Sequence, residues 1–226
     1  MCQPFGPRTR RLCNMDQRIN QPQTGYDPVA EEYAERFLHE LAHKPFDREL
    51  LDRFAARLRG SGPVCDLGCG PGQIARYLHA RGVAAFGMDL SPAMIQVAQR
   101  LNPDLHFEQG DMCALRAADE TWAGIAAFYA IIHVPRSGVV SVLRELRRVL
   151  RSGGLLLLAF HIGDEVIHLD EWWDRPVSLD FYFFSLAEMD GYLREAGFVV
   201  EELLERAPYE AVEHPSRRGY IVARKL

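Results

Sequence analysis

The 226-residue sequence has no apolar run long enough to span a membrane, and its first residues lack the apolar core of a signal peptide. Its net charge is −5, so the chain as a whole offers no basic surface of the kind that binds nucleic acid. These absences favour a cytoplasmic protein that binds neither membranes nor nucleic acid. With 48% hydrophobic and 25% charged residues, the composition is that of a globular chain long enough for one full core.

Cysteine occurs in no recognisable pattern. The five cysteines, an odd number, form no C-x-x-C motif and have no nearby histidines: Cys2, Cys13, Cys65, Cys69 and Cys113. This disfavours a disulfide framework and a zinc site, and it favours a reducing compartment. A metal site made by His161, Glu165 and His168 on a helix is also disfavoured, because Gly163 and the β-branched residues there do not favour a helix. We therefore expect no metal.

Residues 1–24 are polar and irregular, with four arginines and a single acid. We expect a disordered extension here, or a chain that truly starts at Met15, rather than a basic arm for an anionic partner. The remainder, 25–226, is predicted to form one domain whose first part, 25–60, is a helical cap. Within it Asp27 is expected to cap a helix that has Pro28 at its first position.

The most informative stretch runs from Val64 to Gly72 and reads VCDLGCGPG. It predicts a short buried strand that enters three alternating glycines, and helical spacing follows from Gln73 to Ala80. Strand, glycine turn and helix form the first unit of a doubly wound α/β fold, where glycines let a ligand approach the backbone. The spacing is G-x-G-x-G rather than the G-x-G-x-x-G of dinucleotide sites, and the carboxylate of Asp66 would repel pyrophosphate. It suits a cation such as S-adenosylmethionine, which carries a sulfonium and an ammonium group.

Two further acids follow predicted strands. Asp89 ends a strand over 84–89, about 20 residues beyond the first glycine, the offset at which a carboxylate binds both hydroxyls of a ribose. A strand over 105–109 leads into Gly110-Asp111-Met112, where an acid can accept from the exocyclic amine of adenine. Both acids indicate a nucleoside.

Two more strands are predicted, over 122–129 and 155–160. The second is a continuous apolar run and must be buried on both faces. Ligands of doubly wound sheets lie beyond the carboxyl ends of the strands, so Tyr129, Ala130 and His133 are expected to face the ligand crevice.

These motifs together resemble the class I S-adenosylmethionine-dependent methyltransferases, from the Tyr-Asp-x-x-Ala-x-x-Tyr pattern at 26–33, through the glycine turn and Gly-Asp-Met, to about residue 161. The resemblance implies a Rossmann-like, doubly wound α/β fold with a seven-stranded sheet. The sheet would be mostly parallel, with an antiparallel C-terminal strand and helices on both faces. Strands at 198–204 and 219–224 would pair at one edge, with the last strand beside the fifth.

Residues 162–185 are rich in aromatic and acidic side chains. Two partly alternating stretches, 165–171 and 177–184, flank Trp-Trp-Asp-Arg-Pro and predict a β-hairpin. Methyltransferases often place substrate-binding insertions after the fifth strand, so we interpret this segment as a flap over the substrate.

The strand ends and the resemblance together define the predicted site. The residues expected to bind the cofactor are Tyr26, Tyr33, Asp66, Gly68, Cys69, Gly70, Gly72, Asp89, Leu90, Met94, Gly110, Asp111, Met112, Phe128, Tyr129 and His133. Those expected to contact substrate are Tyr129, His161, Trp172, Trp173 and Tyr182. Histidine has an ordinary pKa near 6.5, so His133 and His161 are the candidate catalytic bases, although both are equally consistent with structural roles.

The sequence therefore predicts an enzyme that moves a methyl group from S-adenosylmethionine to a small-molecule acceptor by in-line displacement, leaving S-adenosylhomocysteine. Three alternatives stay open. They are a protein or peptide methyltransferase, a non-catalytic S-adenosylmethionine-binding protein and, least favoured, a nicotinamide-dependent oxidoreductase. The sequence predicts neither the oligomeric state nor which atom is methylated.

Overall fold

A computed structural model describes residues 25–226, so the expectations for residues 1–24 lie outside the described part. The chain forms a seven-stranded sheet in the order β3-β2-β1-β4-β5-β9-β8. The strands are β1 (Pro63–Leu67), β2 (Ala84–Asp89), β3 (Phe107–Gln109), β4 (Trp122–Phe128), β5 (Leu150–Ile162), β8 (Phe198–Arg206) and β9 (Arg217–Lys225). The first five pair in parallel, and β9 runs antiparallel to both neighbours. The predicted fold class is confirmed.

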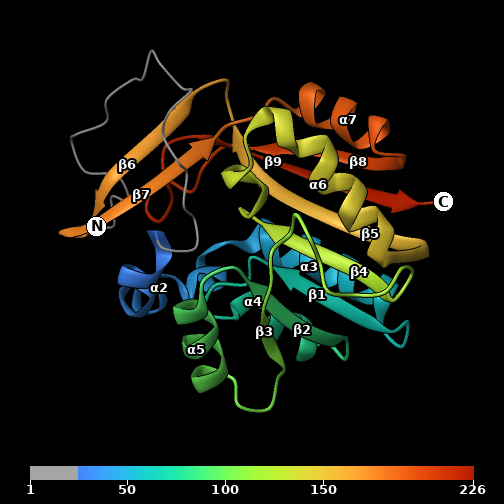
Figure 1. The fold of residues 1–226 in the computed structure, drawn as a ribbon, viewed down its shortest axis with the longest axis horizontal. Coiled ribbons are helices and arrows are strands. Elements are labelled where there is room, and N and C mark those ends of the chain that lie inside the picture. Colours follow the sequence, from blue (N-terminus) through green and yellow to red (C-terminus); the bar gives the residue numbers. More distant parts are fainter. Residues whose placement is uncertain (1–24) are drawn as a thin grey trace.

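Helices cover both faces of this sheet (Figure 1). They are α2 (Ala30–Phe37), α3 (Pro45–Leu58), α4 (Gln73–His79), α5 (Pro92–Leu101), α6 (Arg136–Val149) and α7 (Leu186–Glu195), with short 3-10 turns η1 (Asp27–Val29), η2 (Glu40–His43) and η3 (Ile131–His133). One core packs α6 and α7 against the sheet, and a second core packs α3 and α4 against the opposite face. The helix α3 is thus part of a layer, and only η1, α2 and η2 remain as a cap.

Strand β5 shows why a continuous apolar run becomes a central strand. Leu155, Leu157 and Ala159 face the core with α3 and α4, whereas Leu156 and Leu158 face the core with α6. All five are 3% exposed or less, because side chains alternate between the two faces of a strand and both faces are covered. The strand begins at Leu150, directly after α6, which is earlier than the predicted start at residue 155.

The predicted capping role of Asp27 is wrong. Residues 27–29 form a 3-10 turn without a side-chain cap. The carboxylate of Asp27 instead accepts from the Ser91 hydroxyl at 2.5 Å and from the Ala93 N–H at 3.3 Å. Free N–H groups at the start of a helix attract any acid within reach, so Asp27 adds to the Ser91 cap of α5. This contact ties the N-terminal cap to the sheet domain.

The flap is the predicted β-hairpin, made of β6 (Val166–Trp172) and β7 (Arg175–Tyr182) in a separate two-stranded sheet. Trp173 and Asp174 join the strands with φ of 52° and 59°. Two consecutive left-handed residues give the two-residue hairpin turn that matches the twist of its strands. The hairpin projects beyond the sheet on the side where α2 lies (Figure 1).

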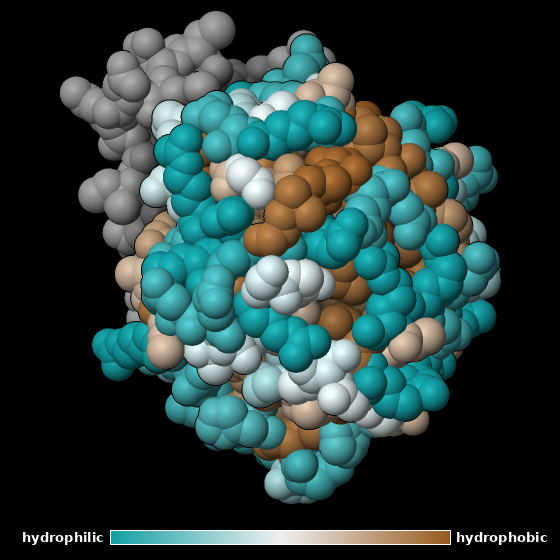
Figure 2. All heavy atoms as spheres, turned by 90° about the vertical axis from the view of Figure 1, so that its right-hand side faces the viewer, coloured by the Kyte–Doolittle hydropathy of each residue, from teal (hydrophilic) through white to brown (hydrophobic). Residues whose placement is uncertain are grey.

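The opposite side of the molecule is mostly hydrophilic, with a band of apolar residues across it (Figure 2). Within residues 25–226 the large apolar side chains that stay exposed are Leu203, on edge strand β8, and Leu226. None of the helices in this part of the chain is both long and apolar enough to cross a membrane.

Candidate functional site

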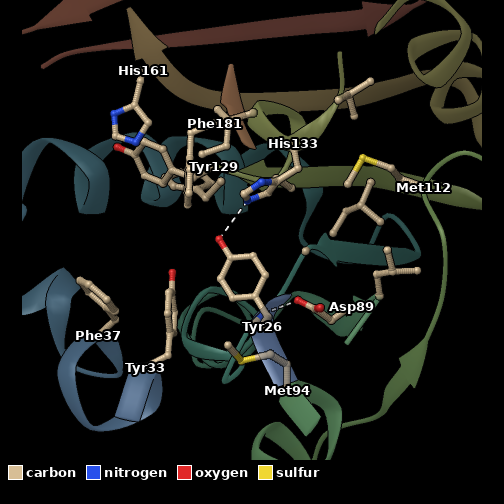
Figure 3. A pocket seen from close by; sticks show the side chains of 18 of the residues that line it. Tyr26, Tyr33, Phe37, Asp89, Met94, Met112, Tyr129, His133, His161 and Phe181 are labelled. Atoms are coloured by element: carbon tan, nitrogen blue, oxygen red, sulfur yellow. Dashed lines mark hydrogen bonds between the residues drawn. The ribbon is translucent and has the colours of Figure 1, made fainter. Parts of the chain in front are cut away.

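A cavity of about 630 Å³ lies at the carboxyl ends of β1, β2 and β4, under the cap and the flap. This is the position where doubly wound sheets bind ligands. It brings together most of the predicted site residues: Tyr26, Tyr33, Gly68, Gly70, Asp89, Leu90, Met94, Gly110, Asp111, Met112, Phe128, Tyr129, His133, His161, Trp172 and Tyr182. In Figure 3 the Tyr26 hydroxyl points toward the His133 ring, and both side chains line the cavity.

At Gly68 the glycine turn approaches its neighbour too closely for any larger residue. Gly68 has φ of 70°, and a Cβ there would stand 2.5 Å from the Ala130 Cβ. Gly70 has φ of 50°, and a Cβ there would touch the Tyr33 ring at 3.7 Å, filling the space above the turn. The glycines therefore keep this part of the cavity open.

Asp66 does not line the cavity, although we expected it to face a cationic ligand. Its carboxylate is 1% exposed and accepts from the Ala75 N–H at 2.8 Å, so it holds the start of α4 behind the turn. Burial raises the pKa of Asp66 to about 7, with a smaller contribution from the charge of Asp89. Cys69 and Gly72 are also packed behind the lining. Trp173 lies outside it, stacked on Trp172 with ring centroids 4.6 Å apart.

Asp89 is held by backbone donors at the end of β2. Its two carboxylate oxygens accept from the N–H groups of Gly70 and Ser91, both at 2.9 Å. Burial raises the pKa of Asp89, while these N–H groups lower it. Each carboxylate oxygen has about two acceptor sites, so each can still accept from one more donor in the cavity. The neighbouring Asp111 is exposed, and its Oδ1 accepts from the Cys113 N–H at 2.8 Å.

His133 links the cap to the flap. Its Nδ1 lies 2.9 Å from the Asp180 carbonyl oxygen, and its Nε2 lies 2.9 Å from the Tyr26 hydroxyl. Because a carbonyl oxygen only accepts, Nδ1 carries the proton and Nε2 accepts from Tyr26. Burial lowers the pKa of His133 to about 4. The imidazole of His133 is therefore neutral, with its Nε2 lone pair engaged by Tyr26, and a role as catalytic base stays a prediction.

Aromatic side chains close the cavity between the cap and the flap. Tyr26, Tyr33 and Trp172 meet pairwise, edge to face, with centroids 5.8 to 5.9 Å apart. Such contacts add about 0.5–1.5 kcal/mol per pair beyond burial. The Arg36 guanidinium covers the outer face of this group, 4.7 Å from the Trp173 ring. The flap and the cap thus form one continuous wall.

The cavity has a charged end that the sequence analysis missed: Glu40, Lys44, Val212, Glu213, His214 and Arg218. Lys44 contacts Glu40 at 2.6 Å and Glu213 at 3.3 Å. Burial alone would lower the pKa of Lys44, but the two carboxylates raise it above its ordinary value. Half of these residues, Val212, Glu213 and His214, come from the β8–β9 loop, which has no motif. The predicted pairing of β9 with β5 could have indicated this end of the cavity, because it brings the start of β9 to the carboxyl end of β5.

His161 lies at this end, opposite Arg218 in the pairing of β5 with β9. Its Nδ1 is 2.8 Å from the Ser216 hydroxyl, and its ring stacks on Phe183 at 4.9 Å. Burial lowers the pKa of His161 well below its ordinary value, and the charges of Arg218 and Lys44 lower it further. Like His133, it is a neutral imidazole, and its role as a catalytic base stays a prediction.

The topology, with its glycine turn and a cavity at the strand ends, defines a class I methyltransferase fold. Residues 64–154 match the family model of the methyltransferase domain. A solved structure, that of the CcbJ methyltransferase from Streptomyces caelestis, superposes with a TM-score of 0.69 at 18% identity, covering 91% of this chain and 99% of that one.

Curated relatives agree with this assignment. A malonyl-[acyl-carrier protein] O-methyltransferase from Enterobacter lignolyticus (strain SCF1) is 30% identical over 158 residues, which is 67% of this chain and 61% of the relative. A demethylmenaquinone methyltransferase from Beutenbergia cavernae is 34% identical over 112 residues, 50% of this chain and 45% of the relative. The chain thus spans between about half and three fifths of the length of such relatives. It belongs to the class I S-adenosylmethionine-dependent methyltransferase family.

Proposed function

We propose that this chain binds S-adenosylmethionine and transfers its methyl group to a small-molecule acceptor. The observation that supports this best is the convergence of the glycine turn, Asp89 and Asp111 on one cavity at the ends of three adjacent strands. The matched methyltransferase domain, 64–154, includes all three features. The region 25–226 would act as one domain, with the cap and the flap (162–185) covering the cavity.

The residues near β1 and β2 fit this cofactor. Asp89 has one acceptor site left on each oxygen for the two ribose hydroxyls, and Asp111 can accept from the adenine amine beside the Met112 backbone. Gly68 and Gly70 line the same cavity, and the turn that they form would let the amino-acid tail approach the backbone closely. Once bound, the cofactor supplies a methyl group already activated by the sulfonium charge. Asp66, behind the turn, would favour that cation through its charge without touching it.

The chain's own part in the reaction is alignment. In-line displacement needs the acceptor nucleophile on the side of the methyl group opposite to sulfur, held at reacting distance. Tyr129, His161, Trp172 and Tyr182 line the part of the cavity that the cofactor-binding residues leave, and we propose them as the acceptor side. The named relatives act on a malonyl group on a carrier protein and on demethylmenaquinone, which supports a small acceptor, free or carried.

The test is calorimetric titration of the purified protein with S-adenosylhomocysteine and, separately, with NADH. We expect micromolar binding of S-adenosylhomocysteine only, as for a nucleoside held by a charged diol contact. Asp89→Ala should abolish that binding, whereas Asp190→Ala, which removes an exposed acid paired with Arg194 on α7, should leave it unchanged. Binding of NADH instead would contradict the proposal and favour an oxidoreductase. Tight binding without transfer to any acceptor would favour a non-catalytic binding protein.

A further inference from the structure

The Tyr26 hydroxyl has its single proton engaged by a neighbour. His133 Nδ1 donates to the Asp180 carbonyl oxygen at 2.9 Å, so His133 Nε2 carries only a lone pair. That lone pair accepts the Tyr26 proton, since the hydroxyl oxygen and Nε2 are 2.9 Å apart. None of the other groups within 25–226 donates to this oxygen. The Tyr26 hydroxyl can therefore accept from a ligand in the cavity but has no proton to give it.

Tyr26 is held in the cavity close to Asp89. Its side chain is only partly buried, lines the cavity and projects from the cap towards His133 (Figure 3). The next residue, Asp27, accepts from the Ser91 hydroxyl at 2.5 Å, and the Ser91 N–H donates to Asp89 at 2.9 Å. Because both bonds meet at Ser91, the backbone at Tyr26 is anchored beside the carboxylate that is expected to bind the ribose.

The charge that acts on Tyr26 is negative. Burial raises the pKa of Tyr26 well above its ordinary value, and the nearby Tyr33 and the carboxylate of Asp89 raise it further. The hydroxyl therefore keeps its proton and its bond to His133. Tyr129, at the other end of the cavity, instead lies between two cations. Lys44 Nζ and Arg218 Cζ are each 5.7 Å from the centre of its ring.

An oxygen that can only accept, beside a carboxylate, suits a cation. Resting on the proposed function, we propose that the Tyr26 hydroxyl oxygen binds the sulfonium centre of S-adenosylmethionine and so distinguishes this cofactor from its uncharged product. The sulfonium is joined to the ribose by one methylene, so a ribose bound to Asp89 brings the cation to the part of the cavity that Tyr26 lines. S-adenosylhomocysteine has a neutral thioether there, which an acceptor oxygen does not attract.

His133 is then a positioning residue. It holds the Tyr26 proton, which leaves the lone pairs of the oxygen for the cation, and its own tautomer is set by the Asp180 carbonyl of the flap. The contact acts on binding rather than on the chemical barrier, because positive charge leaves sulfur as the methyl group is transferred. It favours loading of the cofactor over retention of the product.

The test is calorimetric titration of the full chain with S-adenosylmethionine and with S-adenosylhomocysteine, without any acceptor. Tyr26→Phe removes the oxygen and keeps the ring. We expect its affinity for S-adenosylmethionine to fall roughly tenfold relative to its affinity for S-adenosylhomocysteine, the low end of the value of a hydrogen bond to a charged group. His133→Leu leaves the Tyr26 proton without its acceptor, so that it can point at the cation, and should lower the same ratio. Tyr192→Phe, on α7 outside the cavity, is the matched control.

The ratio of the two affinities separates recognition of charge from a structural effect, because damage to the fold weakens both ligands alike. Equal losses for the two ligands in Tyr26→Phe, up to failure to bind either, or an unchanged ratio would overturn the sulfonium assignment. An unchanged ratio in His133→Leu would overturn the positioning role of His133. The proposed function stands in each of these cases if the unmodified chain binds S-adenosylhomocysteine, and it is overturned if the unmodified chain does not.

Discussion

Glu213 should be among the most sensitive acids in the chain. Its side chain is 1% exposed, accepts from both terminal nitrogens of Arg206 and from the Tyr209 N–H at 2.8 Å, and forms an ion pair with Lys44 at 3.3 Å. Glu213→Gln keeps the shape and removes the charge. The variant leaves Arg206 and Lys44 buried with one counter-charge fewer, and breaking a buried pair in this way usually costs about 3–5 kcal/mol.

The size of the effect can also be worked out from the titration of Glu213. Burial alone would raise the pKa, but Arg206, Lys44 and the Tyr209 N–H outweigh it and lower the pKa from 4.5 to about 2. Each pKa unit corresponds to about 1.36 kcal/mol, so the carboxylate contributes about 3 kcal/mol at neutral pH. Since the folded pKa lies below the unfolded one, this contribution is complete above about pH 5 and is lost as the pH falls towards 2, with about 0.8 kcal/mol gone by pH 4.

The assay is urea unfolding of the protein and of Glu213→Gln at pH 7 and pH 4. We expect the variant to lose about 3 kcal/mol at pH 7, or about 6–12 °C in Tm, and the gap to narrow at pH 4. Glu205→Gln is the control, because Glu205 pairs with Arg217 at the surface, where such pairs contribute about 0–1 kcal/mol. Equal losses in the two variants, or a gap independent of pH, would refute the reasoning.

Three further predictions follow from the site. Asp66→Asn should flatten the pH dependence of the free energy of unfolding. Burial raises the pKa of Asp66 to about 7, so its carboxyl group costs stability as the pH rises from 4 to 7. In urea titrations the variant should therefore be more stable than the unmodified protein at pH 8 and equally stable near pH 4. Tyr26→Phe should cost about 1–3 kcal/mol in thermal unfolding, because it leaves the buried Nε2 of His133 without its donor; no loss would mean that this bond is not formed. Asp27→Ala should cost about 1 kcal/mol by removing an acceptor from the start of α5, and limited proteolysis should then cut the cap sooner; an unchanged cleavage rate would contradict the link.

The half of the cavity near β1 and β2 could be predicted because its parts are local in sequence. A strand that ends in glycines places those glycines at the sheet's carboxyl edge, and parallel pairing then brings Asp89 to the same edge. The spacing of the apolar residues and the glycines of the turn are enough to predict this arrangement. The flap was equally readable, since alternation and the Trp-Trp-Asp turn lie within about 20 residues of one another.

The charged end could not be predicted in the same way. Lys44 and Glu213 are 169 positions apart and meet only because the β8–β9 loop folds back over the end of β5. The lowered pKa values of the two histidines could not be predicted for a related reason. A histidine's ordinary value says nothing of the burial that lowers it to about 4 at His133. Asp66 is another example of what sequence does not show. The motif gives its position in the chain, but it does not indicate that the carboxylate turns inwards to the Ala75 N–H.

The difference between the two halves bears on how the site works. The half near β1 and β2 rests on backbone geometry that a doubly wound sheet supplies, such as the turn at Gly68 and the strand end at Asp89. The other half depends on side chains from the cap, the flap and the last loop, which are held together by aromatic contacts and buried ion pairs. Because sulfonium chemistry needs alignment more than proton transfer, the second half can be assembled from neutral histidines and still serve. Under the proposed function, selectivity for the acceptor depends on these segments, whose contacts with one another are not local in sequence.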